Sequence, residues 1–368
     1  MDAGDTIYLD AASTGPLPAR SVAAETEFTR RRATPHLISY EDQFQTLDRC
    51  RAGIARLIGA ATDEIALAPN TGAGINLAAW GLPLGPGDEV VVPDGEFPAN
   101  MYPWLAAARA RGFSVVVVPQ RDGLLDEAAL VAALDRPSVR VLAVSWVSFA
   151  TGFAADLDHL GHACRARGVL LVVDAIQGLG ALTLDVTRTP IDLLACGAQK
   201  WLLSPWGTGF IWMRRDLLAR IIPQPVSWMA VRSADDFSRL LDYDLTWRDS
   251  ARRFEQVTMA YQAFAGMAAS LELLHELGSR AVAKQVNRSA RRLIEGAGAV
   301  GIPVITPLER SAGIASIRPS NPAGASAALR ASGVIHSLRE GTLRLAPHAF
   351  TSDEDIRTTL TMLHRHGA

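Results

Sequence analysis

Short apolar segments alternate with segments of helical character between about residue 60 and residue 215. The apolar segments are rich in Val, Ile and Leu and mostly lack strict alternation, which is typical of strands buried on both faces. Strands are predicted at residues 64–68, 89–92, 114–119, 139–147, 169–174, 193–196 and 209–213, and helices at 99–111, 126–134 and 156–167. This order predicts an α/β fold whose large domain holds a doubly wound, mostly parallel sheet.

The pattern changes after Pro223. Two long amphipathic helices are predicted over residues 254–277 and 279–300, and a final helix from about residue 352. Shorter strands are predicted near residues 303–305, 313–317, 334–337 and 342–345. We therefore expect a smaller α+β domain packed on the large one. The predicted limits are 17–255 for the large domain, and 1–16 together with 256–368 for the small domain.

Composition and charge argue against several classes of protein. With 49% hydrophobic residues in 368, the chain is expected to fold around a sizeable core rather than remain disordered. A formal net charge of −2 argues against nucleic-acid binding and a polybasic membrane anchor. We expect no transmembrane helix, no signal peptide and a cytoplasmic location. Three cysteines without a CxxC pattern predict no disulfide framework.

Two charged residues follow predicted strands, where open α/β sheets bind their ligands. Asp174 ends a very apolar strand, and a carboxylate there is costly unless a cation or several donors meet it. Lys200 follows the next strand beside Trp201, so desolvation is expected to lower its pKa and make its amine a better nucleophile. Each residue also has a purely structural interpretation. Asp174 could cap a strand-to-loop turn, and Lys200 could be a surface lysine whose aliphatic stem is buried.

The turn at residues 69–76 joins a strand to a helix and is rich in small residues. Backbone N–H groups and the helix dipole at such a turn can bind a phosphate. A dinucleotide fingerprint would need a small residue at 77, and Leu77 there argues against a nicotinamide oxidoreductase. An acid, a desolvated lysine and a phosphate site together suit pyridoxal phosphate (PLP). No metal site is predicted.

Taken in order, these motifs resemble the class V aminotransferases of PLP fold type I. The superfamily includes cysteine desulfurases and isopenicillin N epimerase-like enzymes. The resemblance extends nearly from end to end and rests on YLDAAS (8–13), NTGAGIN (70–76), EFPAN (96–100), VDAIQ (173–177), QK (199–200), RFEQVT (253–258) and LRLAPH (343–348).

The resemblance implies roles for individual residues in cofactor binding. Lys200 would form the internal aldimine and later shuttle the proton, and Asp174 would pair with the pyridinium nitrogen. Thr258 would reach the phosphate of the other subunit, which implies a homodimer with active sites at the interface. Further contacts are expected from Thr71 and Gly72 to the phosphate, Phe97 on the ring, Gln177 to the ring O3′, and Gln199 beside the lysine.

For the substrate, the resemblance implies that Arg344 binds the α-carboxylate. Arg339 is of a type that usually lies on the surface, but its loop is expected to face the active site, so it is also a candidate for binding the substrate side chain. The chain also departs from the desulfurase pattern. Gly197 and Gln199 stand where desulfurases carry Ser-x-His before the lysine, and Phe149 stands near the usual active-site asparagine. The loop 336–341 lacks the cysteine that forms a persulfide.

We therefore expect a PLP-dependent enzyme that acts on the amino group and Cα of a small amino acid through an external aldimine. Aminotransferase-like and C–S lyase-like reactions are both open. The alternatives are an isopenicillin N epimerase-like racemase or epimerase, and a PLP-binding protein without turnover. A persulfide-forming cysteine desulfurase is disfavoured.

Overall fold

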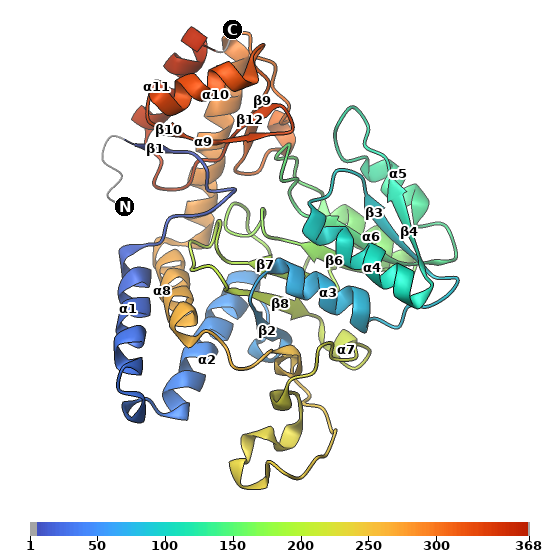
Figure 1. Ribbon diagram of the computed structural model, residues 1–368. Coiled ribbons are helices and arrows are strands. Elements are labelled where there is room, and N and C mark those ends of the chain that lie inside the picture. Colours follow the sequence, from blue (N-terminus) through green and yellow to red (C-terminus); the bar gives the residue numbers. More distant parts are fainter. Residues whose placement is uncertain (1–5, 367–368) are drawn as a thin grey trace.

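A seven-stranded sheet forms the centre of the computed structural model, which describes residues 6–366 (Figure 1). Its strand order is β2-β8-β7-β6-β5-β3-β4. β8 runs antiparallel to both of its neighbours, and all other neighbours are parallel. The strands are β2 (Ile65–Ala68), β3 (Glu89–Pro93), β4 (Ser114–Val118), β5 (Val139–Ser145), β6 (Leu170–Asp174), β7 (Leu193–Gly197) and β8 (Gly209–Met213). The predicted mostly parallel sheet is confirmed.

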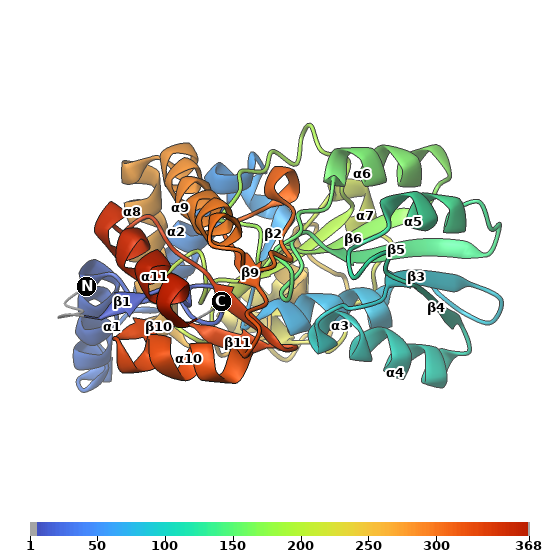
Figure 2. The same ribbon diagram turned by 90° about the horizontal axis from the view of Figure 1, so that it is seen from above.

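Helices cover both faces of this sheet, as Figure 2 shows from above. One face packs against α3 (Thr71–Gly81) and α4 (Tyr102–Arg111), and the other against α5 (Glu127–Ala133) and α6 (Leu157–Ala166). α5 and α6 begin at capping aspartates, whose side chains accept from the backbone N–H three residues on. α4 ends at Gly112, which adopts the left-handed conformation.

A three-stranded antiparallel sheet, in the order β11-β12-β9, forms a second unit above the large sheet in Figure 1. Its strands are β9 (Ala315–Ile317), β11 (Ser337–Arg339) and β12 (Thr342–Leu345), and α9 (Ser279–Ala299), α10 (Pro322–Ala331) and α11 (Asp353–His366) surround it. The N-terminal β1 (Ile7–Tyr8) joins this unit by pairing in parallel with β10 (Val334–Ile335). These elements enclose a core of their own.

The structure differs from the predicted elements in several places. No helix was predicted where α10 forms, and the strand predicted at 334–337 is divided between β10 and β11, which belong to different sheets. The helix predicted from residue 254 begins later, as α8 (Tyr261–Leu277), because the chain first makes a short 3-10 turn at Ala251–Phe254. No strand forms at residues 303–305, where Val304 makes a single bridge to Ile317. Two N-terminal helices that the pattern did not reveal, α1 (Ala19–Arg32) and α2 (Tyr40–Ile58), pack against α8.

The packing of α8 bears on the domain limits. Its buried residues Phe264 and Leu271 belong to the same core as the large sheet. The division at 255/256 remains a prediction. Between α7 (Arg215–Leu218) and α8, the chain makes several short 3-10 turns in a segment that projects below the sheet (yellow in Figure 1).

Candidate active site

A cavity of about 640 Å³ opens at the carboxyl ends of β6 and β7. Residues from both ends of the chain line it, from Ser13 at one end to Arg344 at the other. The structure brings every predicted site residue except Thr258 to its walls: Thr71, Gly72, Phe97, Asp174, Gln177, Gln199, Lys200, Arg339 and Arg344. The cavity lies where ligands are expected in an open α/β sheet.

Asp174 and Lys200 form the charged floor of this cavity. Asp174 is buried, and its Oδ1 accepts a hydrogen bond of 2.9 Å from the Ile176 N–H. Burial raises the pKa of Asp174 to about 6, while the Ile176 N–H and the Lys200 charge lower it. Burial also lowers the pKa of Lys200 to about 8, against the opposing effect of Asp174. A substantial share of the amine is therefore neutral and nucleophilic near neutral pH.

The backbone around Lys200 is held from several sides. The Gly15 N–H donates to the Gln199 carbonyl at 2.8 Å, and a Cβ at Gly15 would lie 2.0 Å from the Lys200 carbonyl oxygen. Trp201 is buried, donates from Nε1 to Gln177 Oε1 at 2.9 Å, and stacks on His348. Only glycine fits at position 15, so the N-terminal segment can lie directly on the lysine loop.

The N-terminus of α3 presents an anion site to the cavity. Asn70 caps the helix by accepting from the Ala73 N–H at 3.0 Å, while the first N–H groups, at Thr71 and Gly72, have no partner within the helix. Thr71 Oγ1 accepts from the Gly197 N–H at 2.8 Å, which leaves its hydroxyl hydrogen to donate. Gly74 allows the helix to lie against the sheet, since a Cβ there would lie 2.5 Å from the Ala195 Cβ. The turn therefore fits a phosphate.

The residues before Lys200 complement each other in size. A Cβ at Gly197 would lie 2.6 Å from Gln199 Oε1 and 3.0 Å from Ile176 Cδ1. The Gln199 side chain therefore lies over Gly197, where any larger residue would displace it. This contact explains physically why glycine and glutamine occur together at the two positions where the desulfurase pattern has Ser-x-His.

Aromatic rings form one wall of the cavity. Phe97 is 45% exposed, and its ring meets that of Phe149 edge to face at 5.2 Å between centroids. Lys200 Nζ lies 5.9 Å from the centre of the Phe97 ring. Gln177 donates from Nε2 to the Ala12 carbonyl at 2.9 Å, which fixes its amide and leaves a second Nε2 hydrogen.

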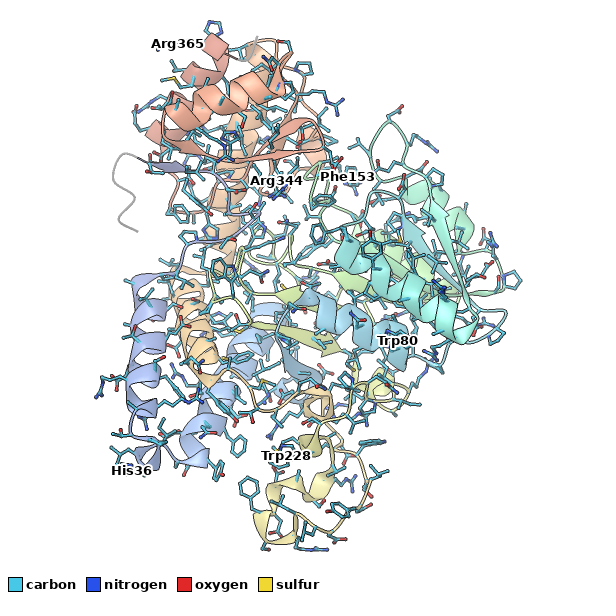
Figure 3. The ribbon with its side chains drawn as sticks, viewed as in Figure 1. His36, Trp80, Phe153, Trp228, Arg344 and Arg365 are labelled. Carbon is cyan, nitrogen blue, oxygen red and sulfur yellow. The ribbon has the colours of Figure 1, made fainter. Side chains whose placement is uncertain are left out.

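Arg344 is anchored by the N-terminal segment. Its Nη1 donates to the Phe149 carbonyl at 2.9 Å, and its Nη2 donates to Ser13 Oγ at 2.6 Å. Asp10 Oδ1 lies 3.5 Å from Nη2. The buried Nε has no hydrogen-bond partner among the described residues. Figure 3 shows Arg344 on the side of the small sheet that faces the large domain.

Three further polar residues lie beside the site residues, although sequence reasoning assigned them no role: Ser13 and Asp10 near Arg344, and Glu96 near Asp174. All three lie in the quoted motifs, but the partners that Ser13 and Asp10 contact are more than 300 residues away. Glu96 accepts from the Ser145 N–H at 2.6 Å, and burial raises its pKa to about 7. Hydrogen bonds from Ser145 oppose this shift, and the Asp174 charge adds to it.

Thr258 and the cysteines lie away from the cavity. Thr258 is exposed in the turn before α8 and contributes nothing to the cavity wall of its own chain. Cys50, Cys164 and Cys196 are all buried, and none of them lines the cavity. Among the described residues, no group of three or more His, Cys, Asp or Glu side chains could hold a metal ion, and no helix is long and apolar enough to cross a membrane.

Comparison with known proteins gives a consistent result. The family model described as aminotransferase class-V matches residues 7–333. A probable cysteine desulfurase of Methanothermobacter thermautotrophicus is 32% identical over 285 residues, which are 76% of this chain and 69% of that protein. Isopenicillin N epimerase of Streptomyces clavuligerus is 34% identical over 228 residues, which are 60% of this chain and 57% of the epimerase.

Solved structures show the same fold. The cystine C–S lyase C-DES, in complex with its reaction product cysteine persulfide, superposes with a TM-score of 0.90 at 23% identity and covers 99% of both chains. A mutant of C-DES with glycine covalently linked to its PLP cofactor gives the same TM-score. A cysteine desulfurase from Thermococcus onnurineus superposes with a TM-score of 0.86, also at 23% identity, and covers 98% of this chain and 94% of that one.

Proposed function

Since the chain belongs to the class-V aminotransferase family, we propose that it is a PLP-dependent enzyme acting on the amino group and Cα of a small amino acid. Aminotransferase-like and C–S lyase-like outcomes both fit. The observation that carries the proposal is that a partly neutral lysine, a buried acid and a buried arginine line one cavity: Lys200, Asp174 and Arg344.

The residues present fit the cofactor. Asp174 accepts the Ile176 N–H with Oδ1 and has an elevated pKa, so its other oxygen, Oδ2, would share a proton with a ring nitrogen. The N–H groups of Thr71 and Gly72, with the Thr71 hydroxyl, would hold the phosphate, and the Gln199 amide lies beside them. Phe97 would cover the ring. When bound, PLP supplies an electron sink for the electron pair released at Cα.

The chain's own residues would position the substrate and move its proton. Arg344 lines the cavity with a guanidinium fixed by its hydrogen bonds, and a planar guanidinium can hold the α-carboxylate with two parallel hydrogen bonds. Lys200, with its lowered pKa, would accept and return a proton at Cα. Phe97 and Phe149 would exclude water from that side.

The acid–base groups of the cavity support a reaction on one face of Cα. Of the charged residues lining it, the two arginines are assigned to anion binding and Asp174 is assigned to the ring nitrogen. Glu340 lies at the exposed tip of a hairpin. Lys200 is then the principal proton carrier, which favours transamination or elimination. Epimerisation, which exchanges protons on both faces of Cα, is the alternative, because one relative is an isopenicillin N epimerase.

Cysteine desulfurases are among the relatives, so cysteine desulfurase activity stays a candidate for this chain. The persulfide route, however, needs a cysteine that reaches the substrate, and this chain's three cysteines are buried away from the cavity. If sulfur is removed, we propose that it leaves with a small product and not on the protein. A related precedent is the structural neighbour named as a cystine C–S lyase, whose product is cysteine persulfide.

A homodimer is part of this proposal. The projecting segment before α8 exposes large apolar side chains, among them Leu241 at 81% and Tyr243 at 87%, and Trp228 marks it in Figure 3. Nearby, the buried Nε atoms of Arg252 and Arg253 have no hydrogen-bond partner among the described residues. A second copy covering this surface would bury the apolar groups and bring Thr258 to the partner's cavity.

Product analysis of the PLP-loaded protein tests the proposal. Each of the twenty amino acids and cystine is supplied with and without a keto acid, and keto acid, sulfide and loss of chirality are measured. Keto-acid-dependent transfer supports the aminotransferase, and sulfur release without an acceptor supports the lyase. Loss of chirality alone supports the epimerase. If no amino acid alters the cofactor spectrum, the chain is a PLP-binding protein without turnover.

A further inference from the structure

The hairpin β11–β12 carries two arginines into the same cavity. Ser337 pairs with Arg344 and Arg339 pairs with Thr342, so Arg339 and Arg344 are diagonal neighbours on one face of the hairpin. The two-residue turn between the strands, Glu340 and Gly341, has positive φ angles of 46° and 71°, as in a tight type I′ hairpin. This short turn holds Arg339 at the mouth of the cavity that Arg344 lines more deeply.

The two guanidinium groups differ in how they are paired. Arg344 is buried and bound by Ser13, the Phe149 carbonyl and the nearby Asp10 carboxylate. The Arg339 side chain is exposed and makes no hydrogen bond or ion pair with any described residue. Its charge nevertheless reaches the reacting amine, because it contributes to the lowered pKa of Lys200. Of the two arginines in the cavity, Arg344 therefore has protein partners, whereas the Arg339 guanidinium has none among the described residues.

An unpaired guanidinium at the mouth of a binding cavity is suited to an oxyanion. Arg344 already accounts for the α-carboxylate, so the group that meets Arg339 must lie elsewhere on the substrate. The Cα atoms of diagonal neighbours on adjacent strands lie about 7–8 Å apart. Two arginines at such positions can therefore hold two carboxylates that are separated by the side chain of one substrate.

We propose that the substrate carries a second carboxylate at the far end of its side chain, which Arg339 binds while Arg344 binds the α-carboxylate. The substrate class is then a dicarboxylic amino acid of about the length of glutamate, or a longer one such as cystine. This inference rests on the proposed function and narrows it, since neutral and cationic amino acids would leave Arg339 unpaired.

Spectral titration of the PLP-loaded protein with matched pairs tests the inference. Glutamate and glutamine have nearly the same size and differ in the distal charge, as do aspartate and asparagine. A charge-assisted contact at this partly exposed site should favour glutamate over glutamine about tenfold. Added salt should reduce the preference, because the contact is at the cavity mouth. Binding without such a preference would overturn the inference.

Arg339→Gln should abolish the preference for glutamate. The matched control is Arg318→Gln, which removes the same charge from an exposed position directly after β9 of the same sheet, outside the cavity. That variant should keep the preference. If Arg339→Gln keeps the preference for glutamate, or if both variants lose it equally, Arg339 does not bind the distal carboxylate of the substrate. If no amino acid changes the spectrum of the unaltered protein, the proposed function itself fails.

Discussion

Lys200 should react as an amine with a pKa of about 8 rather than the usual 10.5. At pH 7, a pKa of 10.5 leaves about one amine in 3,000 neutral, whereas a pKa of about 8 leaves about one in ten. The neutral, nucleophilic fraction is therefore about 300-fold larger at Lys200 than at an ordinary lysine. Burial is the largest cause of this shift, and the positive charges of Arg344 and Arg339 add to it.

The chain offers a matched internal control, because its sequence contains two lysines, Lys200 and Lys284. Lys284 is exposed on α9. Reductive methylation of the cofactor-free protein with formaldehyde, followed by peptide mass spectrometry, measures both rates in one sample between pH 6 and 11. The Lys200 rate should reach half its maximum near pH 8, well below the pH expected for a lysine with the usual pKa of 10.5, and Lys284 serves as the exposed reference in the same sample.

Asp174→Asn tests the contribution of the neighbouring carboxylate to the pKa of Lys200. The Asp174 charge raises the pKa of Lys200, so its removal should move the midpoint for Lys200 below 8. A midpoint near 10.5 in the unaltered protein would refute the reasoning. So would a midpoint that rises in the variant, since an acid that lowers the lysine pKa cannot be its counter-ion.

Other consequences of the structure can be tested separately. Arg344→Lys should weaken amino-acid binding about ten- to hundredfold, measured by spectral titration, while a simple amine without a carboxylate binds nearly as before. Gly74→Ala should cost about 1–3 kcal/mol of unfolding free energy and weaken cofactor binding, because its Cβ would press on Ala195, whereas Gly85→Ala meets no atom within 4 Å and should do neither. Replacing all three cysteines by serine should leave the turnover number of the folded enzyme unchanged; loss of turnover with normal cofactor binding would restore the persulfide route. For Glu96, a pKa raised from the usual 4.5 to about 7 means that the folded state holds its proton more tightly, so stability falls as pH rises from about 4.5 to about 7; Glu96→Gln should remove that part of the decline in denaturant titrations.

The central sheet could be predicted from the sequence because its strands are continuous apolar runs. β6 and β7 are buried at every position, and each leads directly to a charged residue of the site, Asp174 or Lys200. The turn before α3 also carried its own signal in Asn70 and the small residues after it. These features are local, so hydrophobic pattern and turn chemistry suffice to place them.

The missed features depend on packing between distant segments. α1 buries only Ser21 and Phe28, so its pattern has no clear apolar stripe, and it is stabilised by close packing on α8. The contact of Ser13 with Arg344 depends on the parallel pairing of β1 with β10, which no local pattern indicates. Residues 303–305 are apolar enough for a strand, but they make only the single bridge at Val304.

The segment after β1 contacts both Arg344, through Ser13, and the backbone beside Lys200, through Gly15, and this has a consequence for biosynthesis. On the ribosome, the segment that contains Ser13 and Gly15 emerges early, and its partners β10 and Arg344 emerge more than 300 residues later. The central sheet, with Asp174 and Lys200, can fold in the interval, because domains fold largely in order of synthesis. A nascent chain can therefore present its reactive lysine before it can hold a substrate carboxylate, and the two abilities are joined only when the late hairpin docks on the early segment.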